Sequence, residues 1–228
     1  QPIKEIAKLA EAYKIPLHSD AVQSLGKVKL SFKELGLFAM TVSAHKVGGP
    51  VGVAALVLKK GVDITPLLHG GGQERDIRSG TINAAGIASF VSATAFAMRD
   101  MESSYQKVFA LRAKLISTIQ GQVSDVRLNS PLEGEILPGI ANIEFPSTES
   151  DSMLLLFDAE GIACSTGSAC SAGVQEASHV LLAMGRSQAQ ARSSLRFSLG
   201  ISNSEGEIEY LEACIKRVID RARAAYRG

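Results

Sequence analysis

Two short stretches place polar side chains directly after apolar segments. The first, HSDAVQ, ends an apolar run and presents Asp20 and, three residues later, Gln23. The second, SAHKVGGP, follows the apolar FAMTVS segment and presents Ser43, His45 and Lys46 before a glycine turn. Ligands of open α/β sheets bind at the carboxyl ends of strands. A carboxylate and an amine at adjacent strand ends suit pyridoxal phosphate, which needs a lysine to form an imine and an acid to keep its ring nitrogen protonated.

The same lysine has other interpretations. Ser43-x-x-Lys46 matches the serine acyl-enzyme motif of the β-lactamase class. In that class the motif opens a helix and is joined by S-D-N and K-T-G elements, whereas here it follows an expected strand and neither companion occurs. An isolated lysine at a strand end is otherwise an ordinary solvated side chain.

A third stretch, HGGGQERDIRSGTINAAG, combines three glycines with Ser79, Gly80 and Thr81 at the start of an expected helix. A helix N-terminus with hydroxyl groups binds anions readily. A surface turn whose threonine caps the helix explains the residues equally well, and the spacing does not decide between the two. The P-loop pattern G-x-x-x-x-G-K-[ST] is absent.

A fourth stretch, CSTGSACSAG, surrounds Cys170 with small side chains, although a structural cysteine usually packs among large apolar residues. The surroundings of Cys170 suggest mobility and therefore reactivity. Cys164 ends a short expected strand and Cys214 lies beside leucine and isoleucine in the last helix, so we interpret both as structural. A Cys-x5-Cys pair alone does not make a metal site, and we expect no metal.

The elements that must position these residues follow from hydrophobic periodicity. Apolar spacing predicts a helix from Ile3 to Tyr13, strands ending at Asp20 and Ser43, a strand in VGVAALVLKK, and one long helix from Thr81 to about Gln122. Beyond it, VRL, GIANIEF and SSLRFSLG are typical of strands, and ESDSMLLLFDAEG and the C-terminal segment are typical of helices. We predict an α/β domain at 1–100 and a smaller α+β domain at 101–228, divided within the long helix.

Composition narrows the class of protein. The 228 residues carry a net charge of +1 with both signs interspersed, which does not favour a nucleic-acid-binding surface. The longest strongly apolar run, VGVAALVL, is far shorter than the roughly 18 residues that span a bilayer, and no signal peptide is evident. Three cysteines do not suit a disulfide framework and favour a reducing cytoplasm. A small-molecule substrate is the expected partner.

Five stretches together resemble one family. HSDAVQSLGK, SAHKVGGPVGVAALVL, HGGGQERDIRSGT, STGSACSAG and LRFSLG occur in the order and approximate spacing of the NifS/IscS-like cysteine desulfurases, which are fold-type I pyridoxal-phosphate enzymes. The resemblance covers essentially the whole chain. The G-S-A-C-S form is similar to the members with a longer cysteine loop.

The resemblance implies a role for each strand-end residue. Lys46 would be the Schiff-base lysine, Asp20 the partner of the pyridinium nitrogen, and Gln23 the donor to the phenolic oxygen of the cofactor. Ser43 and His45 would hold its phosphate. Thr81 would reach the phosphate in the neighbouring subunit of a homodimer.

The same resemblance assigns the substrate and sulfur chemistry. Arg196 would bind the carboxylate of L-cysteine, and Cys170 would be the nucleophile that takes up its sulfur as a persulfide and leaves L-alanine. An iron–sulfur scaffold or another sulfur acceptor would receive the sulfur, for cluster assembly or tRNA thiolation.

The chain departs from the family in length. Family members are much longer, and their N-terminal part supplies a histidine that stacks on the cofactor and an asparagine beside its phenolic oxygen. Neither is found here, so we expect a fragment of such an enzyme. The alternatives are a non-catalytic fragment that docks a sulfur acceptor, or a selenocysteine lyase or aminotransferase of the same fold.

Overall fold

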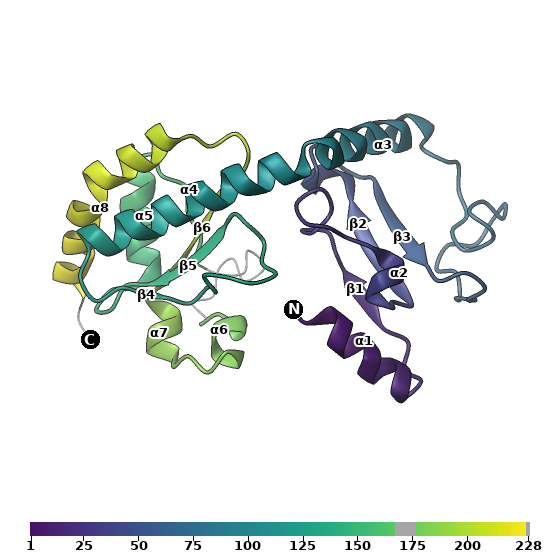
Figure 1. Cartoon of the computed structure of the whole chain (residues 1–228), viewed down its shortest axis with the longest axis horizontal. Coiled ribbons are helices and arrows are strands. Elements are labelled where there is room, and N and C mark those ends of the chain that lie inside the picture. The colour runs from purple at the N-terminus through teal and green to yellow at the C-terminus, as the bar shows by residue number, and fades with distance from the viewer. Residues whose placement is uncertain (167–176, 227–228) are drawn as a thin grey trace. The chain divides into compact units, whose positions relative to one another are not determined.

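The computed structural model describes residues 1–166 and 177–226 (Figure 1). The chain divides into two compact units, Gln1–Glu102 and Ser103–Gly228, each with its own three-stranded sheet. The division falls at the start of helix α4. No described helix is long and apolar enough to cross a membrane.

The sheet of the first unit is ordered β1-β2-β3. Strand β1 (His18–Asp20) runs parallel to β2 (Ala39–Ser43), and β2 pairs antiparallel with β3 (Ala54–Leu58). Helix α1 (Ile3–Ala12) precedes β1, and the short helix α2 (Phe32–Leu35) precedes β2. The small core of this unit consists of Ala21, Leu37, Met40 and Val42. The predicted helix and strands up to β3 are therefore confirmed, with β3 shorter than the apolar run.

The long helix predicted from Thr81 to Gln122 is wrong, because the structure has two helices there. Helix α3 (Ala84–Arg99) ends at Asp100, and α4 (Met101–Gln122) follows at once. The Asp100 carboxylate accepts two hydrogen bonds from the Arg99 guanidinium, at 2.8 and 3.0 Å. Aspartate is unfavourable inside helices because its side chain competes for local hydrogen bonds. A prediction from hydrophobic periodicity takes no account of that competition.

The residue that caps α3 also differs from the expected one. The side chain of Asn83, not that of Thr81, accepts a hydrogen bond from the Gly86 N–H at 3.0 Å. Asparagine satisfies an otherwise unpaired N–H of the first turn. Thr81 lies exposed in the loop before it.

The second unit has a sheet ordered β4-β5-β6, all antiparallel. Its strands are β4 (Arg127–Leu128), β5 (Ile140–Glu144) and β6 (Ser194–Ser198), as the sequence predicts. Helices α4, α5 (Ser150–Ala159) and α8 (Glu205–Ala225) pack against strands β5 and β6 to form one large core. Two five-residue helices that the sequence analysis missed, α6 (His179–Ala183) and α7 (Gln188–Arg192), precede β6.

A buried arginine ties helix α4 to this sheet. Arg112 is 2% exposed, and its guanidinium donates hydrogen bonds to the carbonyl oxygens of Ile140 at 2.7 Å and Pro131 at 2.6 Å. A buried charge costs free energy unless it is hydrogen-bonded. These bonds offset that cost and hold the start of β5, the strand that pairs with the Arg196 strand.

Candidate functional site

The parallel pairing of β1 and β2 brings the predicted strand-end residues to one edge of the first sheet. Asp20 ends β1 and pairs with Thr41, and Ser43 ends β2 two residues later. The 3-10 turn η1 (Ala44–Lys46) follows immediately. Asp20, Ser43 and the side chains of η1 therefore extend from the carboxyl edge, where open α/β sheets bind ligands.

Asp20 and Gln23 share the turn that leaves β1. The Asp20 Oδ1 accepts a hydrogen bond from the Val22 N–H at 2.9 Å, which orients the carboxylate. Three residues later, the Oε1 of Gln23 accepts a hydrogen bond from Lys27 Nζ at 2.6 Å. Asp20 and Gln23 are both exposed, so both can reach a ligand at this edge.

Ser43 and His45 form a pair. The Ser43 Oγ lies 2.8 Å from His45 Nδ1, within hydrogen-bond distance. One proton is used in the contact between them, so the neutral pair offers an anion one remaining donor, the Ser43 hydroxyl or the His45 Nε2–H. Lys46, the next residue, is exposed beside them.

The turn that presents Lys46 depends on a glycine. The Ala44 carbonyl accepts hydrogen bonds from Val47 at 3.0 Å and Gly49 at 2.8 Å. A Cβ at Gly49 would lie 3.0 Å from the Ala44 Cβ and 3.3 Å from the Ala93 Cβ of α3. These distances are shorter than most Cβ contacts in proteins, so glycine suits this close approach, and the packing holds η1 against the helix.

The glycine-rich loop before α3 is ordered by its own polar groups. The Gln73 Oε1 accepts a hydrogen bond from Gly80 N at 2.9 Å, and Ser79 Oγ accepts one from Gly72 N at 3.3 Å. Between them, Glu74, Arg75 and Asp76 have φ angles of 50°, 58° and 62°, a left-handed turn that non-glycine residues rarely adopt. The loop ends immediately before Thr81, which the sequence resemblance predicts to serve a neighbouring subunit.

In the second unit, Arg196 lies in the middle of β6, opposite Asn142 of β5. Its backbone also forms an isolated bridge to Ser165, with Ser165 N donating at 3.0 Å and Arg196 N donating at 2.7 Å. The chain thus enters the CSTGSACSAG stretch directly beside Arg196. Cys170, predicted to be the nucleophile, lies outside the described residues.

The other two cysteines have protonated thiols. Burial, with a smaller contribution from Asp158, raises the pKa of Cys164 to about 11. Burial also raises the pKa of Cys214, whose Sγ donates a hydrogen bond to the Leu211 carbonyl at 3.5 Å. Because the thiolate is the nucleophile, neither sulfur is suited to attack at neutral pH. The expected strand at Cys164 is absent, since only the bridge at Ser165 pairs there.

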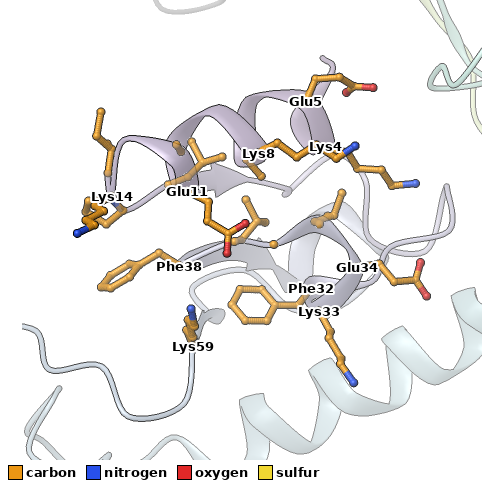
Figure 2. A pocket seen from close by; sticks show the side chains of 18 of the residues that line it. Lys4, Glu5, Lys8, Glu11, Lys14, Phe32, Lys33, Glu34, Phe38 and Lys59 are labelled. Atoms are coloured by element: carbon orange, nitrogen blue, oxygen red, sulfur yellow. The ribbon is translucent and has the colours of Figure 1, made fainter.

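A pocket of about 910 Å³ in the first unit lies elsewhere (Figure 2). It is formed by α1, α2 and the amino-terminal ends of β1 and β2, together with Lys59 and Lys60 after β3. Leu17, Phe32 and Phe38 line it, among lysines and glutamates. It contains none of the predicted site residues, because it lies at the opposite edge of the sheet from Asp20 and Ser43.

Comparison with known proteins identifies the relationship. A sequence model described as aminotransferase class-V matches residues 1–211. The chain belongs to the aminotransferase class-V family. The IscS-like cysteine desulfurase of Mycobacterium tuberculosis is 44% identical over 224 residues, which cover 98% of this chain and 57% of that protein. The chain therefore spans little more than half the length of the curated relatives it matches.

Solved structures of class-V relatives have the same fold. The NifS-like protein of Rickettsia africae superposes with a TM-score of 0.85 at 34% identity, over 96% of this chain and 57% of that one. A structure described as SspA in complex with cysteine superposes with a TM-score of 0.68 at 29% identity, over 90% of this chain and 56% of that one. The predicted fold, part of a fold-type I large domain followed by an α+β domain, is confirmed.

The polar groups at the carboxyl edge fit pyridoxal phosphate, the cofactor of class-V aminotransferases. Asp20 offers a carboxylate for the ring nitrogen, and Gln23 an amide for the phenolic oxygen. The Ser43–His45 pair offers a donor for phosphate, and Lys46 an amine. The ring nitrogen, the phenolic oxygen, the phosphate and the aldehyde of the cofactor therefore each have a chemically suitable group at this edge.

One residue of this edge escaped the sequence analysis. Lys27 contacts Gln23, and its pKa is lowered first by burial and then by the positive charge of Lys46. The available signal was the spacing of Gln23 and Lys27, since side chains four residues apart meet on a helical turn.

Proposed function

We propose that the complete protein is a pyridoxal-phosphate-dependent cysteine desulfurase that converts L-cysteine to L-alanine and takes up the sulfur on Cys170. The observation that carries this proposal is the backbone bridge between Ser165 and Arg196. It joins the segment leading to the proposed nucleophile to the proposed carboxylate-binding residue. Cys170 is five positions after Ser165 in the sequence, and a chain of that length reaches at most about 17 Å. The cysteine desulfurase relatives support the same assignment.

When bound, pyridoxal phosphate supplies an electron-withdrawing ring that stabilises negative charge at the substrate α-carbon. Asp20 holds the proton on the ring nitrogen, and its own hydrogen bond from Val22 fixes the carboxylate for that contact. The Ser43–His45 pair would donate to the phosphate. Lys46 would hold the cofactor through its amine and, with that amine free, would move the proton from the substrate α-carbon.

In the C-terminal unit, Arg196 pairs with the substrate carboxylate, because a planar guanidinium binds both carboxylate oxygens at once. The Cys170 thiolate attacks the sulfur of L-cysteine. A sulfur–sulfur bond forms as the carbon–sulfur bond breaks, and its electron pair remains on the carbon side. Protonation of that carbon and return of the proton from Lys46 to the α-carbon give L-alanine and leave a persulfide on Cys170.

The partners follow from this chemistry. A persulfide must be passed on, so a scaffold of iron–sulfur cluster assembly or a carrier for tRNA thiolation is the proposed acceptor. Thr81 would complete the phosphate site of a second subunit in a homodimer. The cytoplasm, where thiols stay reduced, is the proposed location.

The test uses the complete gene product loaded with pyridoxal phosphate. L-Cysteine should shift the visible absorption band, yield L-alanine and, with a thiol reductant, release sulfide. Cys170→Ser should keep the band and lose sulfide release by at least about 1000-fold, whereas Cys164→Ser should retain it. Normal sulfide release by Cys170→Ser would exclude the proposed nucleophile, and a preference for selenocysteine or for amino transfer would identify a sister activity.

A further inference from the structure

The segment after Asp20 holds Gln23 and Lys27 in one compact turn. Ser24 N and Leu25 N both donate to the Ala21 carbonyl, at 2.9 and 3.3 Å, and Lys27 N donates to the Ser24 carbonyl at 3.1 Å. These bonds place the two side chains one turn apart. Lys27 Nζ reaches the Oε1 of Gln23 at 2.6 Å.

A glycine packs this turn against the rest of the site. Gly26 has φ +70°, and a Cβ there would lie 2.8 Å from the Ala97 Cβ of α3 and 2.9 Å from the Val47 Cγ2. Val47 directly follows Lys46 in the chain. The close approach fixes the backbone on which Lys27 sits, and the Lys27 side chain is partly buried as a result.

Lys27 determines which end of the Gln23 amide, the oxygen or the nitrogen, faces a ligand. A side-chain amide ends in an acceptor oxygen and a donor nitrogen of similar shape, so it can present either to a ligand. A lysine ammonium can only donate. Its bond to Oε1 therefore turns the Nε2 donors of Gln23 away from Lys27, toward whatever acceptor lies beyond.

We propose that Lys27 is a positioning residue that fixes the amide of Gln23 so that its N–H groups face the phenolic oxygen of pyridoxal phosphate. This inference rests on the proposed function, since it concerns the bound cofactor. The lowered pKa of Lys27, caused by burial and by Lys46, agrees with an amine held close to the reactive lysine. In this proposal Lys27 acts on the cofactor through its hydrogen bond to Gln23.

The experiment measures the pH at which the visible absorption band of the bound cofactor titrates, in the complete protein. Lys27→Met keeps an unbranched side chain but removes the donor and the charge. A correctly oriented donor stabilises negative charge on the phenolic oxygen, so its loss should raise the titration midpoint by about one pH unit. Cofactor affinity should fall about fivefold to tenfold.

Three variants separate positioning from other roles. Lys27→Arg, which also can only donate, should restore the wild-type midpoint to within a few tenths of a pH unit. Lys29→Met, which removes an exposed lysine two residues away, should leave it unchanged. In a Gln23→Ala background, Lys27→Met should shift the midpoint by less than about a third as much, because the amide it positions is gone.

The outcomes are distinct. An equal shift in both backgrounds would show that Lys27 acts directly through its charge, and no shift in either would show that it has no role; both results overturn the inference. If Lys27→Met folds poorly, Lys27→Leu carries the same comparison, because it also removes the donor and the charge. A wild-type protein without a cofactor band would refute the proposed function itself, whereas a normal band with an unaltered Lys27→Met titration would refute only the role of Lys27.

Discussion

The two units differ in how they bury apolar side chains and in where they expose polar ones. The C-terminal unit packs three helices on its sheet around fully buried residues such as Phe157 and Ile215. The N-terminal unit has a small core, and its helix α3 buries no residue, with Phe96 57% exposed. The first unit therefore rests on far less hydrophobic burial of its own.

The residues proposed to bind the cofactor and those proposed to bind the substrate lie in different units. The N-terminal unit carries the groups suited to a cofactor, and Asp20, Gln23 and the Ser43–His45 pair each form a hydrogen bond with a residue at most four positions away. The C-terminal unit carries the groups suited to the substrate, with Arg196 on a strand and Cys170 on the segment beside it. Local turns orient the proposed cofactor ligands, whereas Arg196, the proposed substrate residue, is held in a well-packed sheet.

The largest expected effect distinguishes attachment of the cofactor from binding of the substrate. Lys46→Ala should abolish covalent attachment of the cofactor and lower turnover at least about 1000-fold. Arg196→Lys should keep the attachment and raise KM for L-cysteine about 10-fold to 100-fold, because lysine cannot bind the carboxylate with two parallel hydrogen bonds. Borohydride reduction with mass spectrometry, followed by steady-state kinetics, measures both. If Arg196→Lys loses the cofactor, the proposed separation of cofactor-binding and substrate-binding residues between the two units is wrong.

The second prediction concerns packing in the C-terminal unit. Phe157 is 0% exposed and meets Phe197 edge to face, with ring centroids 5.8 Å apart. Phe157→Ala should lower the free energy of unfolding of this unit by about 3–5 kcal/mol. Leu155→Ala, on the exposed side of the same helix, should cost less than about 0.5 kcal/mol. Urea unfolding of the two variants measures these changes in the free energy of unfolding. Equal changes would contradict the buried position of Phe157 in the core.

The third prediction concerns the cysteines and pH. With its pKa raised to about 11, Cys164 is ionised to only about 0.1% at pH 8, and its labelling rate should keep rising as the pH approaches 11. We expect Cys170 to be alkylated at least about 100-fold faster than Cys164 or Cys214 at pH 8. Peptide mapping after timed alkylation gives the three rates. Fast labelling of Cys164 would make it a rival nucleophile.

The smallest expected effect tests the cap of α3 in the N-terminal unit. Asn83→Ala should destabilise this unit by about 1 kcal/mol, because the Gly86 N–H loses its partner. Thr81→Ala should change the free energy of unfolding by no more than about 0.5 kcal/mol. Amide exchange in the first turn of α3 reports the difference. If Thr81→Ala lowers the free energy of unfolding more than Asn83→Ala does, the helix is capped by threonine.

Much of the fold could be predicted because its signals are local. The strands ending at Asp20 and Ser43, the strand in VGVAALVLKK and helices α5 and α8 follow from apolar periodicity and flanking turn residues. The break at Asp100 and the helices α6 and α7 could not be predicted in the same way. Their boundaries depend on side-chain hydrogen bonds or on five-residue segments too short for a periodic pattern.

The candidate site divides similarly. Residue types and their order in the sequence determined which side chains are proposed to carry the chemistry. These are an acid, an amine and a hydroxyl–imidazole pair after apolar runs, and a cysteine among small residues. Only the tertiary structure decided that β1 and β2 run parallel and bring Asp20 and Ser43 to one edge, that Ser165 bridges to Arg196, and that Lys27 donates a hydrogen bond to Gln23. Pairing register and the direction of a side-chain amide depend on contacts between atoms in space, and the identity of each residue alone does not specify them.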